Sequence, residues 1–367
     1  MTIERGTAVR LHSSARTDTP QMLLPALTEP HCHLDKCHTI ARMGPVAGDL
    51  RAAINAQSKD REGWTEEDVR RRAGHGLAQA REAGCGALRS HVDWGDSAQA
   101  PLAWEVLREL GEDAPEITLQ LSPLMGIDRM ADKAFCHDVA RQASAAHGAL
   151  GAFVLDHDRV DEGLRNMINA AETLGLPLDF HVDEGLGDFN GLERIADAIL
   201  NAQFQGPVLC GHAVSLMDRD PDSVARIADK LMRAAIAVCA LPTTNLYLQD
   251  RRKGTPERRG ITRLRELRTA GVRVLTGSDN VGDAFCPMGQ FDPMAALHIA
   301  ALTAHLDPPM GDWLPMITTH AREAMGLDPL WVDGAPLDGL RRGAAPDTCA
   351  LVAGRTPLHC LPVAGSA

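Results

Sequence analysis

The sequence has 367 residues, a formal net charge of −12 and a pI of about 5.6. An acidic surface repels nucleic-acid phosphates and anionic lipid headgroups, so the composition argues against both as partners. No apolar run reaches the ~18 residues that a membrane helix needs, and the N-terminus lacks the apolar stretch of a signal peptide. The nine cysteines are scattered without a Cys-x-x-Cys pair, which is typical of reduced thiols in a cytoplasmic protein.

The chain is expected to begin with polar residues 1–21, which include a short strand near 7–12, followed by a buried strand at 22–30. A helix is expected at 49–57, and a second from the acidic capping motif at Thr65 to Ala83, where Gly84 ends it. Apolar runs then alternate with amphipathic stretches. These predict further strands at 86–93, 117–123, 151–156, 178–184, 207–213, 235–241 and 272–279, and helices at 98–111, 130–147, 160–174, 190–201, 222–234 and 261–270.

Eight strands separated by helices indicate a parallel sheet, and eight such units over roughly 250 residues fit a (β/α)8 TIM barrel. An open doubly wound sheet is the alternative, but no Gly-x-Gly-x-x-Gly turn follows the first strand. Two more helices, at 294–305 and 312–325, are expected to complete the barrel. The tail around 346–354 is expected to form a strand and a turn.

Polar residues gather where the expected strands end, which is the side of a barrel on which chemistry takes place. His31 and His33 lie at i and i+2 and therefore share one face of the first strand. His181 ends the fifth strand, His212 the sixth and Asp279 the eighth. Three imidazoles and one carboxylate at one rim could bind Zn²⁺ or Fe²⁺ and leave room for a water.

These motifs carry a specific resemblance. Glu-Pro-His-x-His-Leu-Asp-Lys at 29–36, His-x-Asp-Glu at 181–184, Gly-His at 211–212 and Ser-Asp-Asn at 278–280 resemble the amidohydrolase superfamily. The closest resemblance is to its cytosine deaminase branch, which also includes triazine aminohydrolases, and it covers about residues 24–327. Segments 89–93, 245–251 and 258–263 support it. The resemblance implies a hydrolytic deaminase that replaces an amino group on a small nitrogen heterocycle by a carbonyl and releases ammonia.

The resemblance also implies roles for individual residues. Glu184 would protonate a ring nitrogen, and His212 would orient the attacking water and help to take its proton. A carboxylate beside the metal, Asp279, could accept that proton. The implied ligands of a single Zn²⁺ or Fe²⁺ ion are His31, His33, His181 and Asp279.

The residues at the end of the fourth strand indicate how many metal ions the site binds. Binuclear members of the superfamily usually place a carboxylated lysine at the end of that strand. None of the five lysines lies near 151–157, so one divalent metal ion is expected. Such an ion lowers the pKa of water to about 7, and a carboxylic acid prevents negative charge from building up on the ring nitrogen.

The expected substrate pocket departs from cytosine deaminases. Leu124 and Met125 stand where a substrate-facing Gln is expected, and Asn280 and Phe285 replace an Asp and a Trp. These four residues, with Asp156, are expected to contact the substrate. Without a polar side chain in place of this Gln, the pocket cannot select strongly for the polar group that the Gln would contact. The identity of the heterocycle therefore stays open.

Two other functions compete with deamination. One is a triazine-type aminohydrolase, similar to N-isopropylammelide hydrolases, or another hydrolase of cyclic amides or amidines. The other is a non-catalytic ligand-binding descendant, which the presence of every expected catalytic residue type disfavours. The partner in all cases is a small heterocycle, and the superfamily suggests a homo-oligomer.

Several neighbours of these residues have open roles. His91 is expected to hydrogen-bond behind the ligands, with Asp93, and not to bind metal. Lys36 faces either the substrate or an acidic partner such as Asp35, and His157 with Asp156 forms either a pocket wall or a solvated turn. Because the segments before and after the barrel are short, the β-sandwich typical of the superfamily is expected to be reduced. The expected divisions are 1–21 and 331–367 for this side domain and 22–330 for the barrel.

Overall fold

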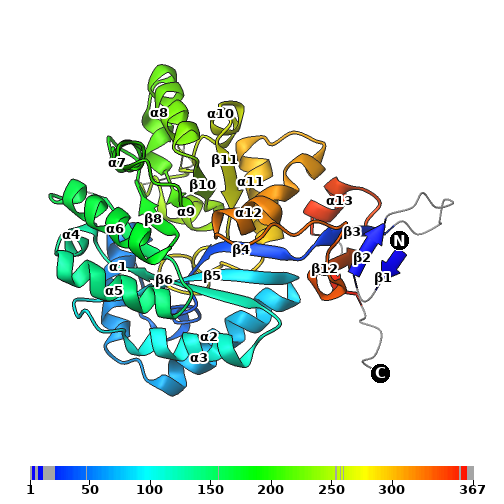
Figure 1. Cartoon of the computed structure of the whole chain (residues 1–367), viewed down its shortest axis with the longest axis horizontal. Helices are drawn as coiled ribbons and strands as arrows, with labels where there is room; N and C mark the ends of the chain where they lie inside the picture. Colours follow the sequence, from blue (N-terminus) through cyan, green and yellow to red (C-terminus); the bar gives the residue numbers. More distant parts are fainter. Residues whose placement is uncertain are drawn as a thin grey trace.

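The computed structural model describes residues 2–4, 7–10, 21–46, 48–155, 157–252, 254–256, 258, 260–354 and 357–361. In this part of the chain, eight parallel strands form two sheets in the orders β4-β5-β6 and β11-β10-β9-β8-β7. Helices lie around the strands (Figure 1). The strands are β4 (Leu27–Cys32), β5 (Cys85–Asp93), β6 (Thr118–Leu124), β7 (Leu150–Val154), β8 (Leu178–Val182), β9 (Val208–His212), β10 (Ile236–Ala240) and β11 (Arg273–Thr276).

Single parallel bridges join the two sheets at both seams. Cys32 of β4 pairs with Asp279, which follows β11, and Gly126 pairs with Phe153 of β7. The eight strands therefore surround one interior, although the hydrogen-bond ladder is reduced at the seams. This is the (β/α)8 arrangement that the alternation of apolar runs and helices predicts.

The two faces of each strand have different partners. In β9, Val208 and Cys210 pack into the large core between strands and helices, while Leu209 belongs to a separate interior cluster with Leu275 of β11 and Ala321 of α12. Successive side chains of a strand point to opposite faces. The same alternation directs polar side chains of β5 and β8 into the barrel.

The helices follow the expected boundaries most closely where capping is strong. For α2, the Thr65 hydroxyl accepts a hydrogen bond from the Asp68 amide at 3.2 Å, and the first turn is acidic. The helices are α1 (Leu50–Arg61), α2 (Glu66–Glu82), α3 (Leu102–Asp113), α4 (Ile127–Met130), α5 (Lys133–Ala145), α6 (Val160–Leu174), α7 (Gly191–Ala202), α8 (Pro221–Arg233), α9 (Pro242–Leu248), α10 (Leu264–Thr269), α11 (Pro293–Ala304), α12 (Thr319–Ala324) and α13 (Thr348–Val352).

Three expected elements take a different form in the structure, and one observed helix was not expected. The helix expected at 130–147 is two helices, because Asp132 caps the start of α5 through the amides of Ala134 and Phe135. The helix expected at 312–325 contains Pro315 and is divided into short 3-10 turns and α12. The strand expected at 346–354 is instead helix α13, which Asp347 caps. Helix α9 has no counterpart among the sequence predictions.

The strand expected at 22–30 is two strands in different sheets. β3 (Met22–Pro25) pairs antiparallel with β12 (Leu340–Gly343), which also pairs with β13 (His359–Cys360). The chain enters the barrel only at β4. A further two-stranded sheet, β1 (Thr2–Glu4) and β2 (Thr7–Arg10), lies beside β3 and β12 at the edge of the molecule (Figure 1).

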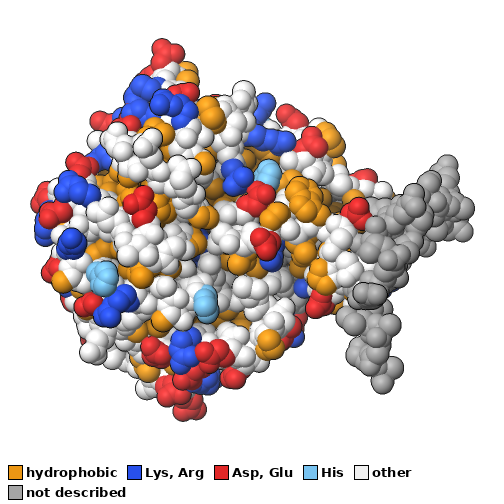
Figure 2. All heavy atoms as spheres, viewed as in Figure 1, with side chains coloured by type: hydrophobic (Ala, Val, Ile, Leu, Met, Phe, Trp, Pro, Cys, Tyr) orange, Lys and Arg blue, Asp and Glu red, His pale blue; other side chains and the backbone are white. Residues whose placement is uncertain are grey.

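On the face seen in Figure 2, acidic and basic side chains are interspersed over the outer helices. Many form ion pairs within or between helices, such as Arg194 with Asp161 at 2.8 Å. Exposed pairs of this kind contribute only about 0.2–1 kcal/mol each. Among the described residues, no helix has the length and apolar character needed to cross a bilayer.

Arg341 joins β12 to the start of β5. Its side chain is 4% exposed and donates hydrogen bonds to the carbonyls of Gly84 at 3.0 Å, Cys85 at 3.3 Å and Asp338 at 2.6 Å. Substitution of Arg341→Met removes these hydrogen bonds, although the Gly84 carbonyl keeps its bond from the Leu27 amide, so we expect the free energy of unfolding to fall by about 2–4 kcal/mol. A lower midpoint of urea unfolding would show it. The matched control, Arg342→Met, changes an exposed neighbour; equal midpoints for both variants would contradict the assignment.

Candidate active site

Three histidines and one aspartate meet at the end of the barrel where the strands finish. His31 lies in β4, His33 just after it, His181 in β8, and Asp279 follows β11. The Nε2 atoms of His181 and His33 are 3.2 Å apart. The Nε2 atoms of His33 and His31 lie 3.3 Å and 3.6 Å from Asp279 Oδ1. The four side chains expected as ligands are therefore brought together.

The buried atoms of this cluster have no hydrogen-bond partner among the described residues. These atoms are His31 Nδ1 and Nε2, His33 Nδ1, His181 Nδ1 and both carboxylate oxygens of Asp279. Buried polar atoms are nearly always paired, because leaving one unpaired costs about 1–3 kcal/mol. Burial also lowers the pKa of all three imidazoles well below the usual value, which keeps them neutral with a free lone pair.

The spacing fits one divalent ion. Ligand atoms at about 2.0–2.1 Å from a tetrahedral Zn²⁺ lie about 3.3 Å from one another. The measured separations of 3.2, 3.3 and 3.6 Å bracket that value. Imidazole and carboxylate donors suit Zn²⁺ and Fe²⁺, so the donor set, the geometry and the unpaired atoms all fit such an ion.

His91 lies against the ligands but has another partner. Its ring is 4.1 Å from the ring of His31 and 4.5 Å from that of His181, measured between centroids. Its Nε2 is 2.9 Å from Asp179 Oδ1, and Arg89 Nη1 donates to Asp179 Oδ2 at 2.6 Å. His91 therefore hydrogen-bonds to a carboxylate as expected, but this partner is Asp179 and not Asp93. That His91 is not itself a ligand stays a prediction, because it also lies within reach of an ion held by His31, His33 and His181.

Electrostatics inside the barrel support this contact. All three side chains of the Arg89–Asp179–His91 group are fully buried. Burial alone would raise the pKa of Asp179, but His91 and Arg89 outweigh it and hold the pKa below the usual range. Asp179 therefore stays ionised and fixes the His91 ring beneath the ligand cluster.

Backbone geometry turns three of the strand-end residues toward the rim. Asp183, His212 and Asp279 adopt left-handed conformations with φ of 51°, 70° and 59°. Such conformations are uncommon outside glycine and gather at functional sites. Asp183 accepts hydrogen bonds from the amides of Gly191 and Leu192 and so caps α7, which leaves the next side chain, Glu184, to face the cavity.

Glu184 and His212 lie beside the ligand cluster. His212 Nε2 is 3.6 Å from Glu184 Oε2, and His212 Nδ1 is 3.1 Å from Asn245 Nδ2. Burial, with the negative charge of Asp279, holds the pKa of Glu184 well above its usual range, while Lys36 acts in the opposite direction. Burial lowers the pKa of His212 to about 4. Burial therefore favours the protonated form of Glu184 and the neutral form of His212.

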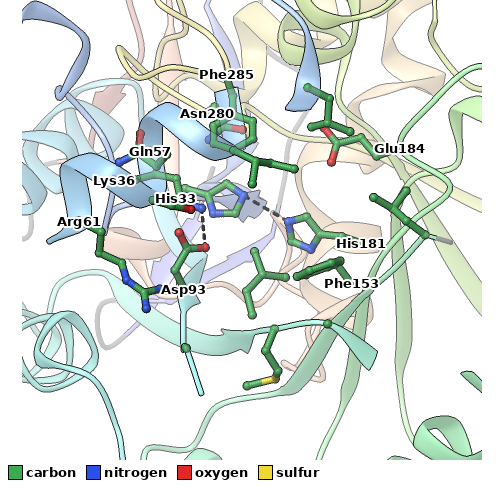
Figure 3. A pocket seen from close by; sticks show the side chains of 18 of the residues that line it. His33, Lys36, Gln57, Arg61, Asp93, Phe153, His181, Glu184, Asn280 and Phe285 are labelled. Carbon is green, nitrogen blue, oxygen red and sulfur yellow. Dashed lines mark hydrogen bonds and ion pairs between the residues drawn. The ribbon is translucent and has the colours of Figure 1, made fainter. Parts of the chain in front are cut away.

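A cavity of about 300 Å³ opens above the cluster (Figure 3). Four of the five residues expected to contact the substrate line it: Leu124, Met125, Asn280 and Phe285. The fifth, Asp156, lies outside the described residues. His157 accepts a hydrogen bond from the Leu155 amide at 3.0 Å and is not among the lining residues.

Lys36 combines the two roles proposed for it. It lines the cavity and also forms an ion pair with Asp93 at 2.6 Å, on the opposite side of the view from Glu184 (Figure 3). Asn280 is fixed by its neighbour, because its Nδ2 donates to Asp283 Oδ2 at 2.7 Å. Its other amide atom, Oδ1, is therefore left for the cavity.

The sequence analysis missed one wall of the cavity. Helix α1 contributes five lining residues, which are Leu50, Ile54, Gln57, Ser58 and Arg61. Their spacing places them on one face of a helix. That periodicity is readable in the sequence, but only the folded chain shows that this face covers the strand ends.

Known proteins share this architecture. A profile of the amidohydrolase family matches residues 65–329. A pterin deaminase of Rhizobium rhizogenes is 36% identical over 309 residues, which are 83% of this chain and 70% of the relative. The structure of 5-methylcytosine deaminase from Klebsiella pneumoniae matches with a TM-score of 0.84 and 22% identity, over 97% of this chain and 90% of that one. N-isopropylammelide isopropylaminohydrolase from Burkholderia multivorans matches with a TM-score of 0.74 and 21% identity, over 96% and 90%.

The absence of a side chain at Gly211 leaves room for the imidazole ring of His31. A Cβ atom at this position would lie 2.7 Å from His31 Cε1 and 2.8 Å from its Nδ1. We therefore expect Gly211→Ala to displace the imidazole and weaken the affinity for Zn²⁺ by about 10–100-fold, measured by competition with a chelator. Gly44→Ala is the control, because a Cβ there would meet nothing within 4 Å. Unchanged affinity in Gly211→Ala would argue against His31 as a ligand.

Proposed function

The chain belongs to the amidohydrolase family, and on this premise we propose that it is a metal-dependent hydrolytic deaminase of a small nitrogen heterocycle. One observation carries the proposal. Three buried imidazoles and a carboxylate lie at the floor of a cavity, and several of their polar atoms have no hydrogen-bond partner among the described residues. Beside them is Glu184, whose pKa burial holds well above its usual range. Hydrolytic deamination needs these parts together: a site for the nucleophile, a proton acceptor and an acid.

The proposed ligands of one Zn²⁺ or Fe²⁺ ion are His31, His33, His181 and Asp279. When bound, the ion lowers the pKa of water and so supplies a nucleophile at neutral pH. The proton transfers are carried out by side chains of the protein. Asp279 is fully buried, and burial raises the pKa of its carboxyl group, so it can accept the proton that the water gives up.

Glu184 supplies the second proton transfer. The water oxygen forms a bond to the ring carbon that carries the amino group, and the adjacent C=N bond loses its double-bond character. Glu184 donates its proton to that ring nitrogen, so that no negative charge is left there. The amino group then takes up the proton held by Asp279 and leaves as ammonia, while the proton of the new hydroxyl group returns to Glu184 and the oxygen remains on the ring as a carbonyl.

The cavity suits a flat, mostly apolar ring with polar edges. Leu124, Met125, Phe153 and Phe285 supply apolar surface, and Asn280 supplies the free amide oxygen. Because the relative at 36% identity is named a pterin deaminase, we propose a pterin as the first substrate to test. A homo-oligomer, a location in the cytoplasm and the division at 22–330 stay predictions from the sequence.

Substitution of Glu184→Gln tests the acid. The amide keeps the shape of the side chain but cannot donate the proton of a carboxylic acid. We expect kcat to fall by about 10²–10⁴-fold with unchanged metal content and Tm. Glu162→Gln serves as the control, because Glu162 forms an exposed pair with Arg159 on α6. Near-normal turnover by Glu184→Gln would assign the proton to another group.

Analysis of the reaction products tests whether the protein catalyses hydrolytic deamination. We expect the Zn²⁺-loaded or Fe²⁺-loaded enzyme to release free ammonia from pterin, in equal amounts with a product in which oxygen replaces the amino group. An ammonia assay combined with mass spectrometry follows both products. Cytosine and triazines that carry free and alkyl-substituted amino groups are run in parallel. Release of a substituted amine, without ammonia from any of the three, would favour the triazine-type reaction.

A further inference from the structure

Helix α9 contacts the ends of three catalytic strands. Gln249, just after the helix, donates to the backbone carbonyl of Glu184 at 3.5 Å. Thr244 accepts a hydrogen bond from the amide of Asn280 at 3.3 Å. Between them, Asn245 reaches His212. The α9 segment resembles cytosine deaminases in sequence, yet the proposed function gives it no role.

Asn245 is the most constrained of these contacts. It is fully buried, and its Nδ2 lies 3.1 Å from His212 Nδ1. The lone pair of an amide nitrogen is delocalised, so this atom donates hydrogen bonds and does not accept them. His212 Nδ1 must therefore accept, and the single proton of a neutral ring must be on Nε2.

The other side of the His212 ring agrees with this assignment. Nε2 faces Glu184 Oε2 at 3.6 Å, and His212 can offer a ligand atom within 4.8 Å of one from Asp279. His212 Nε2 has no hydrogen-bond partner among the described residues, so a proton on this atom is available to an oxygen atom in the cavity. The ring itself is 1% exposed, which disfavours a second proton on Nδ1.

Local packing holds Asn245 in place. Its backbone amide donates to the Leu241 carbonyl at 3.0 Å, and its carbonyl accepts from the Gln249 amide at 2.9 Å. Gly260 leaves room for this turn, because a Cβ there would lie 2.4 Å from Gln249 Cβ. The backbone at Asn245 is thus fixed from both directions along the helix, while Oδ1 of its side chain is buried without a hydrogen-bond partner among the described residues.

We propose that Asn245 is a positioning residue that locks His212 in the tautomer with its proton on Nε2. His212 then donates a hydrogen bond to the oxygen that attacks the ring and becomes the carbonyl, and it does not take the water proton. Asp279 is left as the acceptor of that proton. The proposal rests on the proposed deaminase function for its kinetic consequence, whereas the tautomer itself is a property of the folded protein.

Two substitutions at one position separate positioning from packing. Asn245→Asp replaces the amide by a carboxyl group, which as an ionised carboxylate accepts hydrogen bonds and so favours the His212 proton on Nδ1. Asn245→Leu removes the hydrogen bond and leaves both tautomers accessible. A purely structural role would favour Asp over Leu, because Asp is closer to Asn in shape and polarity.

The proposal predicts the opposite order. We expect kcat to fall by about 10²–10⁴-fold in Asn245→Asp and by about 10-fold in Asn245→Leu, with similar metal content. Tyr247→Phe, on the same helix, is the control and should match the wild type. Activity of Asn245→Asp equal to or above that of Asn245→Leu would overturn the proposal.

A spectroscopic measurement tests the tautomer without turnover. Nitrogen-15 NMR of histidine-labelled, Zn²⁺-loaded protein distinguishes a protonated ring nitrogen from a bare one, and His212→Gln assigns the signal. We expect protonated Nε2 and bare Nδ1 in the wild type, reversed in Asn245→Asp. Protonated Nδ1 in the wild type would refute the proposal, even if the protein is an active deaminase. The expected NMR result without any deaminase activity would instead refute the proposed function alone.

Discussion

The site depends on the burial of polar atoms that find no hydrogen-bond partner among the described residues. His31, His33, His181 and Asp279 place lone pairs in an interior from which water is largely excluded. Each unpaired atom costs free energy, so the fold must hold the cluster against its tendency to open toward solvent. A divalent ion shared by the four side chains removes that cost, because every lone pair directed at it gains a partner.

The surrounding framework explains how the cluster is held. Glu29, fully buried two residues before His31, accepts hydrogen bonds from the backbone amide and the hydroxyl of Ser278, next to Asp279. This contact ties the first barrel strand to the last at the seam where the ladder is weakest. Burial raises the pKa of Glu29 to about 8, so it forms this contact as a neutral acid. The metal-facing side chains are therefore carried by strand ends that are joined directly.

Much of this could be predicted from the sequence, because strand periodicity and strand-end polarity are local. The eight strands, the capped helix from Thr65 and the cluster at His31 follow from patterns within a few residues. The split of the first strand at Ala26 could not be predicted, since only pairing with Leu340–Gly343 separates β3 from β4. Likewise, the partner of His91 is Asp179 from a distant strand, and the cavity wall of α1 depends on how a connecting segment folds over the rim.

The central claim is that the four side chains bind a single divalent ion. Elemental analysis of the purified protein, after removal of loosely bound ions, measures this directly. The account predicts one Zn²⁺ or Fe²⁺ per chain, and much less than one in His181→Ala at the same protein concentration. Two ions per chain, or an undiminished content in His181→Ala, would contradict it.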